Sequence, residues 1–294
     1  MNFHTFVNAA IPILKNTSCQ LIFTIGIIAT FGFIVGLTNR AFFKLVGYKF
    51  GRVTSMATGF IGVPVHEIGH ALFCLIFKHK ITEIKLYQPN SADGTLGYVN
   101  HRYNPQSIYH QIGNFFIAYG PILFGSAMLL LLMFWLVPNL FQTFTNSSDF
   151  SKIQSVDIFS FSALKYVYSV TQGASIAFYS ASEPDNWRWW LFMIPACSIA
   201  LHMSLSATDM KASWVGFGFI VVTLLIINTT LYFVKIDAMP TITNYCLMAG
   251  AFILNFLTIS VVFSLTLFLF GVVIRVIRKL RGSFCAPHNI SHVN

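Results

Sequence analysis

The sequence predicts an all-α polytopic membrane protein with about six transmembrane helices and one small β-hairpin. Hydrophobic residues make up 55% of the 294 residues and charged residues only 9%, whereas a soluble domain carries about 25% charged residues. Apolar runs long enough to span a bilayer recur along the chain. One of these runs contains polar side chains of a kind that marks a functional site in a membrane.

The apolar runs divide the chain into spans that together form a single integral domain over residues 1–294. We expect no cleaved signal peptide, because no small-residue cleavage site follows the first residues. The segment 159–180 is apolar but contains Lys165, so we interpret it as an interfacial or re-entrant helix that has the length to span. The expected spans cover about 21–38, 56–77, 112–137, 189–209, 213–234 and 245–274.

The charges predict orientation and partners. Six spans place both termini on one side, and four bases in the tail (Arg275, Arg278, Lys279 and Arg281) predict that this side is cytoplasmic. The basic linker 40–52 is then expected on the opposite side. We expect a multi-pass protein of a bacterial inner membrane that contacts the lipid bilayer. No basic stripe suggests binding to nucleic acid, five scattered cysteines predict no disulfide framework, and oligomeric state is not predicted.

The most informative segment is the predicted span 56–77, which contains His66-Glu67-Ile68-Gly69-His70. This is a His-Glu-x-x-His (HExxH) motif. On a helix the two histidines share one face and can bind one Zn²⁺, while Glu67 can deprotonate the attacking water. Imidazoles and a carboxylate are costly among apolar residues, which favours a functional role. Packing against neighbouring helices or a proton relay is the alternative interpretation.

A β-hairpin is expected directly after the motif helix. Residues 81–87 and 95–99 are rich in β-branched and aromatic side chains, and the turn sequence Ser91-Ala92-Asp93-Gly94 separates them. A plain polar loop is the alternative. Such a hairpin offers an exposed edge on which an extended substrate can add as a strand. The candidate substrate-strand residues are Ile81, Ile84, Leu86 and Tyr98.

A catalytic zinc site needs a third protein ligand besides His66 and His70. Candidates with lone pairs in or beside spans are His110, His202 and Asp209. His202 and Asp209 are seven residues apart, so that on one helix both would face the same interior. The residues alone therefore leave the third ligand open.

The motif order resembles the site-2 protease family of intramembrane zinc metalloproteases over roughly residues 56–211. The resemblance consists of His-Glu-x-x-His in a span, a hairpin, a span with Gly120-Pro121 and a later span ending at Asp209. It implies that His66, His70 and Asp209 bind Zn²⁺ and that Glu67 is the catalytic base. His202 is then a second-shell or oxyanion-stabilising residue. The implied activity is hydrolysis of peptide bonds in membrane-anchored protein substrates.

The sequence departs from the family pattern at two places. Tyr119 stands where the family has Ala before Gly-Pro, and Asp209 lies between Thr208 and Met210 rather than in Leu-Asp-Gly. Three alternatives therefore stay open. The first is a membrane zinc endopeptidase of the prenyl-cysteine type, which would use Glu183 or Glu83 as third ligand. The second is a non-enzymatic transporter or scaffold, and the third is an inactive relative of the proteases.

Overall fold

The computed structural model describes residues 3–91, 94–146, 161–205 and 207–284. The strands are β1 (Lys80–Lys85) and β2 (Tyr98–Arg102), and a π-helical turn, Ile22–Gly26, joins the first two helices. The helices in chain order are α1 (Phe3–Leu21), α2 (Ile27–Val46), α3 (Tyr48–Ile76), α4 (Ile108–Leu136), α5 (Pro138–Asn146), α6 (Phe161–Ser180), α7 (Trp187–His202), α8 (Ala207–Val234) and α9 (Met239–Phe284).

The structure agrees with the predicted class of helical membrane protein but not with the expected number of spans. Within the described residues, five helical segments are long and apolar enough to cross a bilayer. The first is a single segment of 40 residues that includes the expected span 21–38. The five segments are Val7–Val46, Tyr48–Ile76, Ile108–Leu136, Asp209–Val234 and Met239–Leu280.

The expected span at 189–209 is not one continuous helix. Helix α7 has 16 residues and ends at His202, and Asp209 lies in the first turn of α8. The reason is visible in the sequence, because the apolar run ends at Leu201 and polar residues follow it. Helix α6 covers most of the segment 159–180 but is not among the five span-length apolar helices, while residues 159–160 lie outside the described part.

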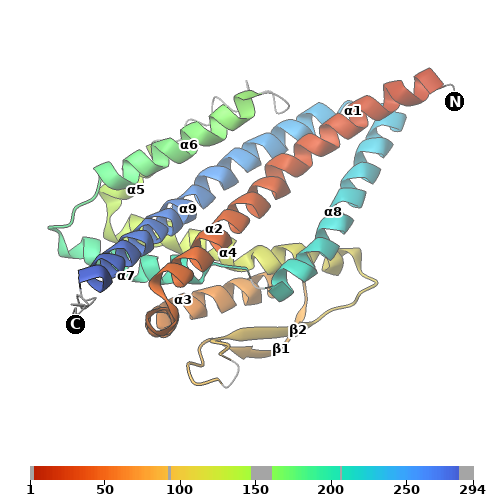
Figure 1. Cartoon of the computed structure of the whole chain (residues 1–294). Coiled ribbons are helices and arrows are strands. Elements are labelled where there is room, and N and C mark those ends of the chain that lie inside the picture. The colour runs from red at the N-terminus through yellow and green to blue at the C-terminus, as the bar shows by residue number, and fades with distance from the viewer. Residues whose placement is uncertain (1–2, 92–93, 147–160, 206, 285–294) are drawn as a thin grey trace, which may run out of the picture.

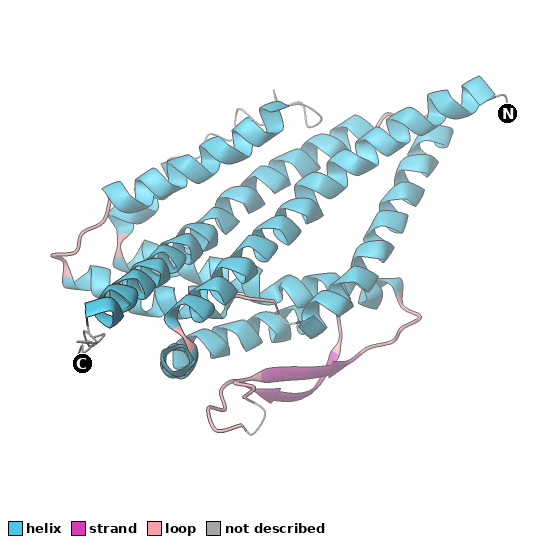
Figure 2. Ribbon diagram, in the orientation of Figure 1, coloured by secondary structure: helices cyan, strands magenta, loops and turns pink. Residues whose placement is uncertain are grey.

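The helices form two groups that cross each other. Figure 1 shows α1 and α2 as one long rod beside α9, whereas α3 and α4 run below them and carry the hairpin on their far side. Helix α8 extends from α3 and α4 to the N-terminal part of α1, as the ribbon in Figure 2 also shows. The start of α8 therefore meets the motif helix, and its end is held by a different part of the bundle.

Buried amide and hydroxyl groups fix the far end of α8 in this apolar bundle. Asn228 on α8 donates to Thr17 Oγ1 at 2.9 Å and to Gln20 Oε1 at 2.8 Å on α1. Gln20 Nε2 also donates to Thr243 Oγ1 on α9 at 3.1 Å. Interhelical hydrogen bonds of this kind hold membrane helices together where no hydrophobic force distinguishes helix from lipid.

The basic linker and the basic tail lie at the same end of the molecule. Arg278 on α9 donates from Nη1 to the carbonyl of Val46, and its guanidinium lies 5.2 Å from the centre of the Phe50 ring. Side chains that touch cannot be on opposite sides of a hydrocarbon layer about 30 Å thick. The expectation that the membrane separates residues 40–52 from the tail is therefore wrong.

The predicted hairpin is present, with strands shifted by a few residues. Strands β1 and β2 pair antiparallel, with Lys85 opposite Tyr98. Gly94 has φ +78° and donates to the carbonyl of Ser91, while residues 92–93 of the turn lie outside the described residues. The Tyr87 hydroxyl donates to the carbonyl of Met56 at 2.6 Å and fastens the hairpin to α3.

Candidate metal centre

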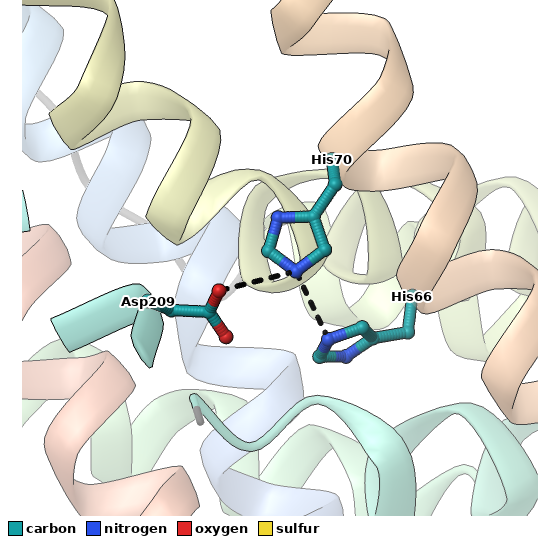
Figure 3. A group of neighbouring side chains, drawn as sticks. All are labelled: His66, His70 and Asp209. Atoms are coloured by element: carbon teal, nitrogen blue, oxygen red, sulfur yellow. Dashed lines mark hydrogen bonds and ion pairs between the residues drawn. The ribbon is translucent and has the colours of Figure 1, made fainter. Parts of the chain in front are cut away.

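Three side chains from two distant segments converge in the middle of the molecule. Figure 3 shows His66 and His70 on successive turns of α3 and Asp209 on α8 pointing toward one another. The two Nε2 atoms are 3.2 Å apart, and His70 Nε2 is 3.7 Å from Asp209 Oδ1. One ligand atom from each residue lies within 4.8 Å of the others.

Backbone carbonyls fix the orientation of both imidazoles. His66 Nδ1 lies 2.6 Å from the carbonyl oxygen of His202, and His70 Nδ1 lies 2.8 Å from that of Ile117. A carbonyl oxygen only accepts hydrogen bonds, so each Nδ1 carries the proton. In a neutral imidazole the other nitrogen then has a free lone pair. Both Nε2 lone pairs therefore face the same point as the Asp209 carboxylate.

This donor set fits a zinc ion. Two facing lone pairs and a carboxylate repel one another unless a proton or a metal cation lies between them. At zinc–nitrogen distances of about 2.0–2.1 Å, tetrahedral ligand atoms are about 3.3 Å apart, close to the 3.2 Å between the two Nε2 atoms. Two histidines and one carboxylate also leave the fourth position open, as a catalytic zinc site requires.

Glycines allow the two carbonyls to reach the histidines. A Cβ atom at Gly69 would lie 2.7 Å from Pro121 Cα, and one at Gly120 would lie 2.6 Å from the Gly69 carbonyl oxygen. Helices α3 and α4 thus touch backbone to backbone next to His70. A Cβ atom at Gly62 would similarly lie 2.6 Å from His202 Cδ2 on α7. The Gly120-Pro121 sequence therefore serves the site by bringing the Ile117 carbonyl onto His70.

Tyr119, the first departure from the family pattern, has a simple packing explanation. Its side chain is buried and stacks on Phe115 with ring centroids 4.7 Å apart. A Cβ atom at Gly32 on α2 would lie 3.0 Å from Tyr119 Cε1, so Gly32 provides the room for the larger ring. The substitution affects the contact between α4 and α2 and leaves the α3–α4 contact at Gly120 intact.

Glu67 and the three candidate ligands line one cavity of about 520 Å³. Strand β2 and the residues just before it form a second wall, which extends from Thr95 to His101. The Glu67 side chain is 5% exposed, and a Cβ atom at Gly97 would lie 2.9 Å from Glu67 Cγ. The hairpin therefore closes directly over the candidate base.

His202 lies beside the candidate ligands, and its backbone carbonyl rather than its ring contacts one of them. Its carbonyl accepts from His66, whereas its ring nitrogen Nε2 lies 3.0 Å from Thr58 Oγ1. The His202 imidazole does not belong to the group of described side chains that can hold a metal, and it is not among the residues that line the cavity. His110 is not a ligand either, since its Nδ1 accepts from the Asn104 N–H at the start of α4.

The candidate substrate-strand residues are divided by the hairpin. Tyr98 lines the cavity together with other residues of β2. Ile81 and Ile84 lie on β1 and Leu86 follows it, and none of the three lines the cavity. Pairing turns β2, and not β1, toward the candidate ligands, and the part of these three residues in binding a substrate strand stays a prediction.

The glutamates of the alternative zinc site lie elsewhere. Glu183, outside the membrane spans, accepts hydrogen bonds from Asn139 at 2.8 Å and Asn186 at 3.1 Å, and these bonds lower its pKa. Glu83 accepts from the Tyr98 hydroxyl at 2.6 Å on an exposed face of the hairpin. Within the described residues, neither belongs to the group that can hold a metal.

Sequence reasoning missed three cavity or near-cavity residues, His79, His101 and Asn114. His101 and Asn114 line the cavity, and His79 Nδ1 lies 3.1 Å from His101 Nδ1. A usable signal was present, because His101 lies two residues after Val99, the end of the predicted second strand, and would share its face if the strand continued. Lys78-His79-Lys80 indicated only the end of the span.

Comparison with known proteins adds no assignment. No protein-family model, no curated protein and no solved structure matches this chain. The resemblance to site-2 proteases therefore depends on the motif residues and on the geometry around them.

Proposed function

We propose that this protein is an intramembrane zinc metalloprotease of the site-2 protease type. One observation carries the proposal: two carbonyl-oriented histidines and Asp209 direct their lone pairs to one point, and Glu67 lines the same cavity. Helices α3, α4 and α8, which build this cavity, are long and apolar enough to span a bilayer. The cofactor is Zn²⁺, held by His66, His70 and Asp209.

The residues divide the chemistry of peptide hydrolysis among them. Bound Zn²⁺ would polarise the scissile carbonyl and acidify water. Glu67 takes the proton of the attacking water and gives it to the leaving amine as the C–N bond breaks. The carbonyls of His202 and Ile117 keep the two imidazoles in the tautomer and orientation that the metal needs.

The substrate class follows from the position of the cavity. A substrate reaching a cavity among membrane helices is itself membrane-anchored, and a helix hides its carbonyls in hydrogen bonds. The substrate must therefore be extended where it is cut. Strand β2 forms a wall of the cavity beside Glu67 and offers backbone groups to such a segment.

Two alternatives are less well supported. A prenyl-cysteine-type protease needs a glutamate as third ligand, and both Glu83 and Glu183 are engaged away from the histidines. A proton relay or scaffold needs no metal. A proton shared between the two Nε2 atoms would also account for their separation of 3.2 Å, so the zinc content of the protein distinguishes this alternative from the protease.

The first test measures zinc and cleavage on the same preparations. We expect about one zinc per chain by elemental analysis of the detergent-purified protein, and zinc loss in Asp209→Ala. Glu67→Gln should retain the zinc and abolish cleavage of a labelled single-span peptide with a glycine-rich span, because only the base is removed.

His202→Phe is the matched control for the assignment of the third ligand. It removes an imidazole beside the site but keeps the carbonyl that accepts from His66, so zinc should remain bound. A parent protein without zinc would contradict the protease proposal, and turnover retained in Glu67→Gln would remove Glu67 from its role.

A further inference from the structure

Two chains of hydrogen bonds begin at backbone carbonyls and end at the wall of the metal cavity. One passes through the histidines of the hairpin, and the other passes through two amide side chains of α4. Their last members, His101 and Asn114, both line the cavity that contains Glu67. Neither chain is needed to orient the three candidate ligands.

The first chain determines which nitrogen of His101 is free. His79 Nε2 lies 3.0 Å from the carbonyl oxygen of His110 and therefore carries a proton. In a neutral His79 the Nδ1 atom is then an acceptor, and the atom 3.1 Å from it is His101 Nδ1, which must donate. His101 Nε2 is left with a lone pair.

Burial keeps both rings in the neutral form that this assignment requires. His79 is 3% exposed, stacks on Tyr103 and lies outside the spans, and burial lowers its pKa to about 4. Burial also lowers the pKa of His101. At neutral pH the end of the chain is therefore a hydrogen-bond acceptor and not a cation.

The second chain orients Asn114 in the same way. Gln111 Nε2 donates to the carbonyl of Pro105 at 2.6 Å, which leaves the Gln111 Oε1 atom for Asn114, one turn further along α4. Asn114 Nδ2 donates to that oxygen at 3.2 Å. Asn114 Oδ1 receives no donor from the described part of the chain and is not a sealed, unpartnered atom. Asn114 lines the cavity, so its side-chain amide lies at the cavity wall.

An extended peptide presents alternating carbonyl and N–H groups, and the two kinds need different partners. The metal site and Glu67 serve the scissile carbonyl and the water. A desolvated backbone N–H costs free energy unless an acceptor meets it. The two oriented chains supply acceptors of this kind, each held in place by a carbonyl at its other end.

We propose that His101 Nε2 and Asn114 Oδ1 accept hydrogen bonds from backbone N–H groups of the extended substrate and so position it beside the metal. His79 and Gln111 are positioning residues, because they act through His101 and Asn114. The proposal rests on the proposed protease function. It assigns to the chain the site that recognises the peptide backbone rather than any side chain.

The test uses inhibitors that bind without being cleaved. The probe is a succinyl hydroxamate peptide with two amide N–H groups, compared with analogues N-methylated at one amide each. Binding to the zinc-loaded full-length protein is measured by calorimetry in detergent. We expect N-methylation to weaken binding about tenfold in the parent, the loss of one well-placed hydrogen bond.

Variants then show which residue meets which N–H. In His101→Phe, one of the two N-methylations should weaken binding only about twofold or less, because its acceptor is already gone. In Asn114→Leu, the other N-methylation should weaken binding by a similarly small factor. His79→Phe keeps the aromatic stack on Tyr103 but cuts the first chain, and should resemble His101→Phe. Thr82→Val is the matched control, because Thr82 donates to the Asn100 carbonyl and does not line the cavity.

Acetohydroxamate, which has no peptide N–H, distinguishes a failure of the proposed protease function from a failure of the proposed acceptor site. If it fails to bind and the parent holds no zinc, the protease function itself is wrong. If it binds to the parent but N-methylation of the peptide costs nothing, the acceptor site is wrong whatever the variants do. The same holds if N-methylation costs as much in His101→Phe and Asn114→Leu as in the parent.

Discussion

The chain has two histidine clusters, His66 with His70 and His79 with His101, and they use their nitrogen lone pairs differently. At His66 and His70, two separate carbonyls accept hydrogen bonds from the Nδ1–H groups. Both Nε2 lone pairs therefore point at one another and at Asp209. At His79 and His101 a single carbonyl begins a chain, in which the lone pair of His79 Nδ1 accepts from His101 and the lone pair of His101 Nε2 stays available.

The difference indicates that the acceptors around the rings, and not the number of histidines, decide where nitrogen lone pairs converge into a candidate metal site. In the first cluster the converging atoms need a proton or a metal cation between them. In the second cluster both nitrogens of His79 are in hydrogen bonds, and only His101, the last ring, keeps an acceptor nitrogen. Within the described residues only the first cluster qualifies as a group that can hold a metal.

The largest expected effect is on zinc content, when the loss of a histidine from the first cluster is compared with the loss of one from the second. Loss of a residue that only supports a ligand costs about 10- to 100-fold in metal affinity, so loss of a ligand should cost more. We expect His66→Ala to lose its zinc on dialysis and His79→Phe to retain it, as measured by elemental analysis. Equal zinc loss in both variants would contradict the division between the clusters.

A smaller effect, on the rate of cleavage, should come from displacing the segment before β2 that lines the cavity beside Glu67. A Cβ atom at Gly97 would lie 2.6 Å from Val63 Cγ1 and 2.9 Å from Glu67 Cγ. Gly97→Val should therefore displace Glu67 and reduce cleavage about 10- to 100-fold while zinc stays bound. Gly218→Ala is the control, because its added Cβ meets nothing within 4 Å. Unchanged cleavage in Gly97→Val would show that the hairpin does not position Glu67.

The smallest effect concerns pH and the hairpin cluster. The pKa of His79 falls from 6.5 to about 4 on folding because the ring is buried, next to His101, His110 and Tyr103. Between these values the unfolded chain binds more protons, so stability falls as the pH falls from 6.5 to 4 and is unaffected by this group at higher pH.

Thermal unfolding in detergent checks this sign. The Tm of the parent should decrease on acidification through that window, and the Tm of His79→Phe should decrease less. A parent Tm that is constant or rises between pH 6.5 and 4 would show that His79 is not buried neutral in the folded hairpin.

The sequence by itself determined the membrane class, the motif helix and the hairpin. Each of these is written in a short stretch: apolar runs give the spans, the spacing of His66 and His70 gives a shared face, and β-branched residues around a turn give the strands. It also named Asp209 as a candidate third ligand, without deciding between Asp209 and His202.

Only the tertiary structure decided how these pieces meet. The ring of His202 turns to Thr58 while its carbonyl, 136 residues from His66, sets the tautomer of that ligand. Asp209 lies in the first turn of α8, and His101 lines the cavity because β2, and not β1, forms the cavity wall. A lone pair's direction depends on which backbone carbonyl packs against the ring. That contact is made between segments far apart in the chain, so local sequence patterns do not encode it.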